Sequence, residues 1–310
     1  MHKTTDDQPP QLEANGERFL PDMQGNIALE HLHRYAIARE FGAGKMVLDI
    51  ASGEGYGSAL LAEAAERVIG VDISSEAVAH ANVKYRRPNV KFMRGSCTDI
   101  PLSNCSVDVV VSFETIEHHA EHEAMLRELK RVLRPAGLLI ISSPDKREYS
   151  ERANHGNAYH VKELYADDFA ALIKKCFAHV ALLGQRVLYG STVVLDGESE
   201  ETLHYYREAG SMIHAHHGLM RPVYHVAVAS DFDLPPLRSS LFEQLGESDP
   251  QIAALRQELD LTHRRIAGLQ EEVDGLHAAI DAIHGSHSWK ATRPLRAMMN
   301  LFRSNHRIRE

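Results

Sequence analysis

The sequence lacks the features of several common protein classes. It has only three cysteines in 310 residues, an odd number without the spacing of a metal site, which argues against a disulfide-stabilised fold. No apolar run approaches the roughly 20 residues that a membrane span needs, and the polar start MHKTTDDQPP is unlike a signal peptide. The net charge of −9 argues against nucleic-acid binding by bulk electrostatics. We therefore expect a soluble, cytoplasmic protein with no nucleic-acid partner.

Two familiar catalytic motifs are also absent. No Gly-x-Ser-x-Gly stands at an expected strand-to-helix turn, which argues against a Ser-His-Asp hydrolase of that type. The glycines near residue 55 do not follow the Gly-x-Gly-x-x-Gly spacing of a nicotinamide site, because Ser58 stands three places after Gly55. Any ligand of this glycine-rich stretch must be identified from other residues.

The stretch 46–57, MVLDIASGEGYG, is the most informative part of the chain. Three apolar residues precede Asp49, and glycines follow at 53, 55 and 57. This pattern predicts a buried parallel strand that turns sharply into a helix at about 57–67. Glycine reaches positive φ at low cost and lets a ligand approach the backbone, while the helix N-terminus offers unpaired N–H groups. We expect a nucleotide-like ligand here.

Apolar runs alternate with amphipathic segments from residue 27 to residue 176. Alternating strands and helices predict an α/β fold with a doubly wound, mostly parallel sheet of seven strands, the last two forming a hairpin around a polar insertion at 196–220. The expected strands are 46–51, 68–74, 90–93, 107–114, 138–145, 179–190 and 223–230, and the expected helices are 27–41, 57–67, 75–85, 121–133 and 161–176. The helix 27–41, which carries His31, His33 and Arg34, is either an edge helix or a lid over the ligand.

The chain outside this domain divides into four further parts by composition. We expect a disordered N-terminus at 1–16, the α/β domain at 17–230, a linker at 231–250, a coiled coil at 251–285 and a basic amphipathic tail at 286–310. The tail interleaves basic and aromatic residues, which suits an anionic membrane face or simply a solubilising role.

The coiled-coil prediction rests on apolar residues that alternate spacings of three and four. They are Ile252, Leu255, Leu259, Thr262, Ile266, Leu269, Val273, Leu276, Ile280 and Ile283. The residue types favour a parallel dimer, in which Glu258 and Glu272 would face His263 and His277 of a second copy. The alternative is a single amphipathic helix packed on its own domain.

Three acidic positions belong to the first three expected strands. Asp49 lies in the first strand, Asp72 ends the second and Asp99 follows the third. Asp72 stands 23 residues after Asp49 and suits the two hydroxyls of a ribose, in NAD and in an adenosyl sulfonium equally. Asp99 suits an adenine amino group. The fourth strand ends in the acid/imidazole cluster 114–119, ETIEHH, at the sheet edge where ligands of open α/β folds bind.

With these motifs the chain resembles the class I S-adenosylmethionine-dependent methyltransferases, whose fold is Rossmann-like. The resemblance rests on VLDIASGEGYG, VIGVDIS, GSCTDIPL, VDVVVSFETIEH and ELKRVLRPAGLLIIS, in the family's order, over about residues 45–145. It implies that S-adenosylmethionine is the cofactor, held by its methionine part near Asp49 and the glycine turn, by its ribose at Asp72 and by its adenine at Asp99. The implied cofactor contacts are Asp49, Ala51, Ser52, Gly53, Gly55, Asp72, Ile73, Cys97, Thr98, Asp99 and Phe113.

The flanking segments are similar to a narrower set. GERFLPDMQGNIALEHLHRYAIA and NAYHVKEL resemble bacterial methyltransferases of cell-surface polysaccharide biosynthesis, and SWKATRPLR resembles a tail of glycosyltransferases in those pathways. This resemblance implies O-methylation of a sugar hydroxyl at the inner membrane face. The alternatives are a methyltransferase for a quinone or phenol-like hydroxyl, and a non-catalytic scaffold that recruits glycosyltransferases through its coil.

Removal of the acceptor's proton needs a base near the cofactor. His118 is the first candidate because imidazole is neutral near pH 7, and His160, after the fifth strand, is the second. Glu117 would orient His118 or contact the cofactor. His118 and His122 have the i, i+4 spacing of metal ligands, but no third ligand is evident at a useful spacing. We therefore expect no metal.

Overall fold

The computed structural model describes residues 12, 19–21, 23, 25–154, 156–188, 203–206, 214–243 and 250–296. The chain forms two compact units, 1–245 and 246–310. The expected disorder of residues 1–16 falls, apart from Leu12, outside the described residues.

The first unit is built on a seven-stranded sheet with the order β3-β2-β1-β4-β5-β9-β6. Only β9 is antiparallel to its neighbours within this sheet, which confirms the mostly parallel Rossmann-like prediction and the final hairpin. The strands are β1 (Met46–Ile50), β2 (Arg67–Asp72), β3 (Val90–Arg94), β4 (Val107–Ser112), β5 (Leu133–Pro144), β6 (His179–Gln185) and β9 (Tyr224–Ser230). Because the chain order reverses between β1 and β4, the carboxyl ends of these two strands form the natural ligand edge.

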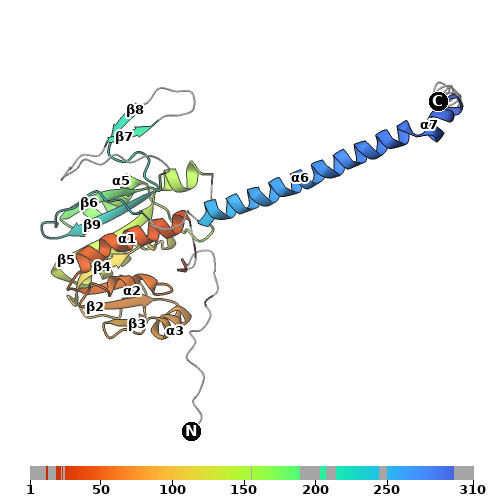
Figure 1. The fold of residues 1–310 in the computed structure, drawn as a ribbon. Coiled ribbons are helices and arrows are strands. Elements are labelled where there is room, and N and C mark those ends of the chain that lie inside the picture. The colour runs from red at the N-terminus through yellow and green to blue at the C-terminus, as the bar shows by residue number, and fades with distance from the viewer. Residues whose placement is uncertain are drawn as a thin grey trace, which may run out of the picture. The chain divides into compact units, whose positions relative to one another are not determined.

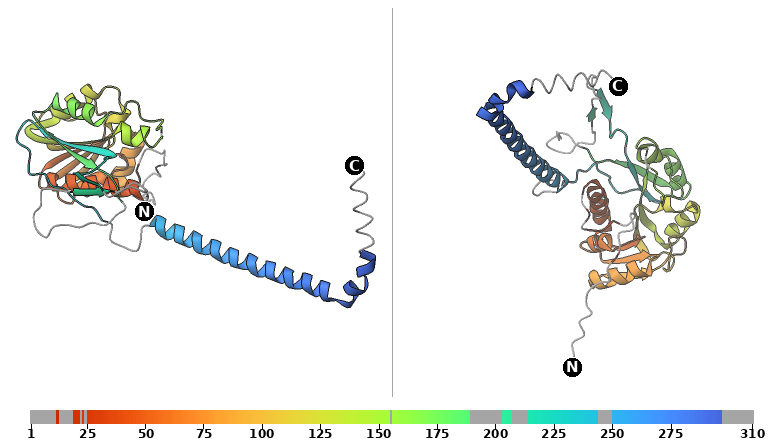
Figure 2. Two further views of the ribbon diagram at one scale, coloured as in Figure 1. Left: turned by 90° about the horizontal axis from the view of Figure 1, so that it is seen from above. Right: turned by 90° about the vertical axis from the view of Figure 1, so that its right-hand side faces the viewer.

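Helices cover both faces of the sheet (Figures 1 and 2). They are α1 (Asn26–Gly42), α2 (Tyr56–Leu61), α3 (Ser75–Lys84), α4 (His122–Val132) and α5 (Ala166–Lys174). Leu126 of α4 and Phe169 of α5 belong to one buried apolar cluster. Tyr35 of α1 and Leu61 of α2 belong to the other. Apolar side chains on both faces explain why the central strands read as continuous apolar runs.

Several boundaries differ from the sequence prediction for identifiable reasons. Helix α2 ends at Leu61 rather than 67, because the side-chain amide of Asn89 donates hydrogen bonds to the carbonyl oxygens of Ala62 and Ala65 just beyond it. Strand β5 begins at 133 rather than 138, with a shift in its register to β4. Helix α5 begins at 166 rather than 161, because the N–H groups of 161 and 162 donate to the carbonyl of Glu117.

Two short features were not expected. A π-helix, Lys146–Glu151, follows β5, and the side chain of Asp145 accepts a hydrogen bond from the N–H of Glu148 at its start. The polar insertion contains an antiparallel pair, β7 (Leu203–Tyr206) and β8 (His214–His217). The short apolar runs and caps of these elements gave too weak a pattern to predict them.

The compact unit extends past the expected domain end at 230 to Leu245. Leu234 and Leu237 pack against the α1/α2 side of the core. Further on, the hydroxyl of Ser240 lies 2.8 Å from Nε2 of His33, and the ring of Phe242 stacks on the ring of His33. Residues 231–243 therefore contribute to the domain although they form no helix or strand.

The second unit contains a continuous helix, α6 (Pro250–Gly285), and the short α7 (His287–Ala291). A helix is present where the coiled coil was predicted, at 251–285, and its pairing with a second helix stays a prediction. Seven residues of the predicted heptad seam, from Leu259 to Ile283, are 46–59% exposed. The basic tail is described only to residue 296, and 297–310 lie outside the described residues. No described helix is both long enough and apolar enough to cross a bilayer.

Candidate functional site

The turn after β1 adopts the left-handed geometry that its glycines predicted. Gly53 and Gly55 have φ of 55° and 99°, and Ala51 is also left-handed at 59°. A Cβ added to Gly55 would lie 2.7 Å from the Cβ of Ala81 and 3.0 Å from the ring of Phe92. Only glycine fits position 55 without movement of α3 or β3, so the turn presents bare backbone at the sheet edge.

Asp72 joins this turn to the end of β2. One carboxylate oxygen accepts the N–H of Gly53 at 2.8 Å, and the other accepts the N–H of Ser74 at 2.8 Å. The carboxylate is thereby fixed in orientation at the carboxyl edge of the sheet. Each oxygen keeps a further lone pair for a ligand hydroxyl. The structure thus adds a direct hydrogen bond between Asp72 and the glycine turn, and the ribose contact of Asp72 stays a prediction.

Asp49 lies deeper than a simple ligand contact would suggest. It is 1% exposed and accepts hydrogen bonds from the hydroxyls of Ser58 at 2.6 Å and Tyr35 at 3.2 Å. Burial raises the pKa of Asp49 to about 7, although these two hydrogen bonds lower it. Asp49 therefore changes its charge near neutral pH, and it lies directly behind the turn.

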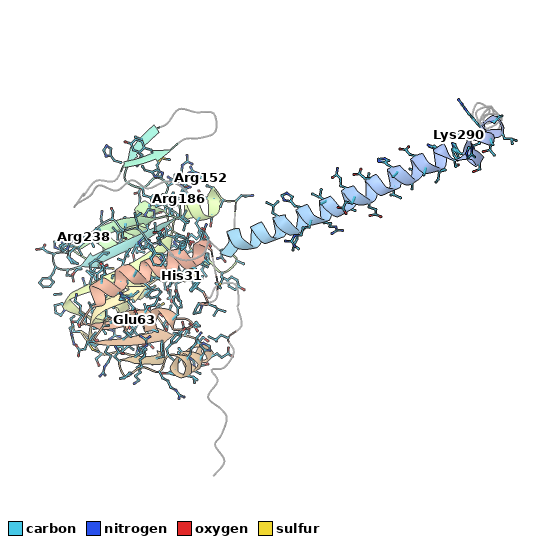
Figure 3. The ribbon with its side chains drawn as sticks, viewed as in Figure 1. His31, Glu63, Arg152, Arg186, Arg238 and Lys290 are labelled. Carbon is cyan, nitrogen blue, oxygen red and sulfur yellow. The ribbon has the colours of Figure 1, made fainter. Side chains whose placement is uncertain are left out.

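Helix α1 covers the turn. A Cβ on Gly57 would lie 2.0 Å from Cζ of Tyr35, so α1 and α2 meet in direct contact at this position. His31, labelled in Figure 3, makes a 2.7 Å hydrogen bond through Nδ1 to the hydroxyl of Tyr56, the first residue of α2. These contacts pack α1 against α2, as expected of a packing helix, and its role as a lid over the ligand stays a prediction.

Glu54 was not identified from the sequence, although it stands inside the turn. Its carboxylate is 1% exposed and interacts with the side chains of His80, Lys84 and Tyr85, the first two on α3 and the third at its end. The network ties the turn to α3. A buried acid among glycines was the available signal, but its partners lie 26 to 31 residues away.

The predicted adenine side is built from the ends of β2 and β3. Ile73 is 66% exposed beside Asp72, an unusual position for a large apolar side chain and a flat contact for a ring. The N–H of Asp99 donates a hydrogen bond to the carbonyl of Ser96, and the hydroxyls of Ser96 and Thr98 lie 2.9 Å apart. Cys97 is buried instead, 3.0 Å from Nε2 of His119. Among these residues, Cys97 contributes packing rather than an exposed contact.

Arg34 of α1 reaches the end of β4, a contact the sequence did not indicate. It is 1% exposed, and its Nη1 donates to Oε1 of Gln185 and lies 3.4 Å from Oε1 of Glu114. Its guanidinium also lies over the rings of Tyr224 and Phe113. Glu114 has φ of 47°, and such backbone strain concentrates at functional sites.

The three predicted catalytic residues come together. Rings of His118 and His160 lie 5.1 Å apart between centroids, at 82°. Nε2 of His118 is 4.0 Å from Oε1 of Glu117, which is 1% exposed. Tyr149 of the π-helix stacks on His160 and contacts Tyr224 edge-on. His122, by contrast, is buried on α4 and is not part of this group.

Backbone and side-chain hydrogen bonds hold both imidazoles in place. Nδ1 of His118 lies 3.0 Å from the carbonyl of Tyr159, which can only accept, so this nitrogen carries the proton. Nδ1 of His160 lies 2.6 Å from Oε1 of Glu163. In each neutral ring Nε2 then carries the lone pair.

Comparisons with known proteins agree with this geometry. Residues 48–141 match the family model described as Methyltransferase domain. A Mycobacterium tuberculosis protein described as a probable S-adenosylmethionine-dependent methyltransferase is 37% identical over 186 residues, covering 57% of this chain and 65% of that protein. A Mycolicibacterium smegmatis protein of similar description is 36% identical, covering 54% and 65%. The chain thus spans less than two thirds of the length of these curated relatives.

More distant similarities extend in two directions. A demethylmenaquinone methyltransferase of Beutenbergia cavernae is 34% identical over 119 residues, covering 38% of this chain and 49% of that protein. The crystal structure of a SAM-dependent methyltransferase from Thermotoga maritima is 17% identical with a TM-score of 0.47, covering 66% of this chain and 90% of that one. Residues 48–141 are therefore similar in sequence to a methyltransferase domain.

Proposed function

We propose that the chain is an S-adenosylmethionine-dependent O-methyltransferase. The observation that carries the proposal is the Asp72 carboxylate, fixed between the glycine turn and the end of β2 within the segment that matches the methyltransferase family. A carboxylate in this position suits the two ribose hydroxyls of an adenosyl group.

The residues present fit this cofactor. The hydroxyl of Ser52 is buried in the turn without a hydrogen-bond partner among the described residues. A buried hydroxyl of this kind is satisfied when a polar ligand lies against it. Asp72 would hold the ribose, Asp99 the adenine, and the turn in front of Asp49 the methionine part. The bound cofactor supplies an electrophilic methyl group.

The chain's own residues would align the acceptor and remove its proton. Nε2 of His118 accepts the hydroxyl proton, while Tyr159 keeps Nδ1 in the donor role. His160 has the same arrangement through Glu163 and is the second candidate base. The acceptor oxygen would take the methyl group, and the electron pair of the broken carbon–sulfur bond would stay on the cofactor's sulfur.

The proposed acceptor is a sugar hydroxyl, supported by the flanking-sequence resemblance. The second candidate, a quinone or phenol-like hydroxyl, is favoured by the similarity to a demethylmenaquinone methyltransferase. Incubation with methyl-labelled S-adenosylmethionine and either saccharide or demethylquinone acceptors tests both. Micromolar cofactor binding with label transfer to one acceptor supports the enzyme, whereas neither binding nor transfer would leave only the scaffold function.

Cofactor affinity should depend on pH through Asp49. Its pKa of about 7 means that the carboxyl is protonated below neutrality, and a cationic sulfonium nearby favours the charged form. Affinity therefore rises from pH 6 to pH 8, by up to about tenfold per unit below the pKa, and levels off above it. Calorimetry should also detect proton release on binding at pH 6.

Two controls isolate this effect. S-adenosylhomocysteine lacks the sulfonium charge and should show a smaller pH dependence. Asp49→Asn should remove the dependence for both ligands. If the affinities of wild type and Asp49→Asn depended on pH in the same way, Asp49 would not be the group that causes the pH dependence.

The exposed seam of α6 supports pairing with a second copy of the chain. Apart from Thr262, every seam position is apolar over about five heptads, a longer repeat than docking on a domain requires. Truncation after Leu245, where the compact unit ends, should convert a dimer into a monomer by light scattering. Leu269→Asp on the seam should do the same, whereas Leu261→Asp, equally exposed but off the seam, should not. A dimer that persists after truncation contradicts the proposal.

A further inference from the structure

We propose that Glu117, His118 and His160 form a site for a divalent transition-metal ion that binds two neighbouring oxygen atoms of the acceptor. One ligand atom from each of these residues lies within 4.8 Å of the others. Nε2 of His118 and Oε1 of Glu117 are 4.0 Å apart. Ligand bonds of about 2.0–2.2 Å place two atoms on one such ion at most about 4.4 Å apart, so side-chain rotations must bring the three ligand atoms closer together to complete the site.

The hydrogen bonds around the cluster are those of metal-binding histidines. A histidine that ligates a metal donates its other ring N–H to a carbonyl or carboxylate, which fixes the tautomer and the ring orientation. His118 donates Nδ1–H to the Tyr159 carbonyl, and His160 donates Nδ1–H to the Glu163 carboxylate. Both rings thus have Nε2 lone pairs, and Glu117 supplies the negative charge.

The backbone also brings the three residues together in a defined way. Glu117 and His118 lie on the short 3₁₀ helix Ile116–His118 after β4. His160 lies on the loop after the π-helix, and the N–H groups of the next two residues donate to the Glu117 carbonyl at 2.9 and 3.0 Å. The loop and the helix are therefore fixed to each other at the sheet edge, where a base had been expected.

The donor set selects the ion and the acceptor. Two imidazole nitrogens and one carboxylate suit Mn²⁺, Fe²⁺, Co²⁺ or Zn²⁺ better than Mg²⁺ or Ca²⁺, which prefer oxygen ligands. Three protein ligands leave positions open for substrate. Two adjacent hydroxyls, as in a sugar diol or a catechol, would chelate the ion.

This acceptor class rests on the proposed methyl transfer. In the metal-loaded protein His118 is a ligand, and the ion lowers the pKa of the coordinated hydroxyl. The hydroxyl loses its proton to water, its oxygen forms the bond to the methyl carbon, and the carbon–sulfur electron pair stays on sulfur.

Titration of the full chain with Co²⁺, followed by visible absorption and calorimetry, tests the site directly. We expect one specific ion per chain. Loss of an outer-sphere partner typically weakens metal binding 10–100-fold, so Glu163→Gln should fall in this range. Glu117→Gln and His160→Ala should each lose about 100-fold or more. His216→Ala, on the histidine-rich strand β8, is the matched control and should retain the affinity. Equal affinity in Glu117→Gln, His160→Ala and wild type would overturn the site.

Two further readouts keep the outcomes distinct. Circular dichroism of each variant checks that the domain is folded. Absence of S-adenosylmethionine binding by the wild-type protein would overturn the proposed function but not the metal site. Catechol should change the Co²⁺ spectrum at concentrations where phenol does not, since only catechol chelates. Equal responses to the two would overturn the diol assignment while the ion binding stands.

Discussion

Replacing Asp72 by alanine should weaken S-adenosylmethionine binding by at least about a hundredfold while the domain stays folded. The carboxylate would accept hydrogen bonds from two ribose hydroxyls, and a hydrogen bond to a charged group contributes about 1.5–3 kcal/mol. Loss of both corresponds to at least about a hundredfold weaker binding. The N–H groups of Gly53 and Ser74, which Asp72 now accepts, lie on partly exposed backbone and can bond to water. Calorimetry measures the binding, and circular dichroism the fold.

Asp108→Ala is the matched control for this variant. Asp108 also accepts a backbone N–H, that of Met46 at 2.9 Å, and pairs with Arg134. It lies near the start of β4, at the opposite end of the strands from the turn. It should lose a similar amount of stability and bind the cofactor normally. Unchanged affinity in Asp72→Ala would remove the ribose assignment.

Gly57→Ala should destabilise the domain by about 3 kcal/mol, the upper part of the range for overpacking a core. The added methyl carbon would overlap the ring of Tyr35 at 2.0 Å. The ring cannot move away without leaving the buried Asp49 carboxylate, to which its hydroxyl donates. Alanine is otherwise the better residue within a helix by about 1 kcal/mol, so steric overlap must dominate. Thermal unfolding should show a midpoint lower by roughly 6–12 °C, at 2–4 °C per kcal/mol.

A second substitution separates overlap from any other effect at this position. In a Tyr35→Ala background the ring is gone, and Gly57→Ala should cost little or even fill part of the space. Gly156→Ala, where the added Cβ has no neighbour within 4 Å, should leave the stability nearly unchanged. Additive losses in the double variant would contradict the contact between α1 and the turn.

The parts of the site that depend on local pattern were predictable. Gly53 and Gly55 adopt the expected left-handed turn because only such backbone can follow a strand so abruptly. Asp72 lies beside the turn because neighbouring parallel strands end at one edge. Strands β6 and β9 pair as an antiparallel hairpin, as expected, since each apolar segment is long enough to form a full strand. The expected boundaries failed where a distant side chain or backbone group, such as Asn89, ended an element early.

The sequence by itself determined the Rossmann-like strand and helix order, the glycine turn and the acids at three strand ends, because each depends on residues close together in the chain. Only the tertiary structure decided three features of the site. The Arg34 guanidinium lies beside Glu114, burial raises the pKa of Asp49 to about 7, and the ring of His160 lies next to that of His118. These contacts join residues 42 to 80 positions apart or depend on what excludes water, and no spacing along the chain encodes either.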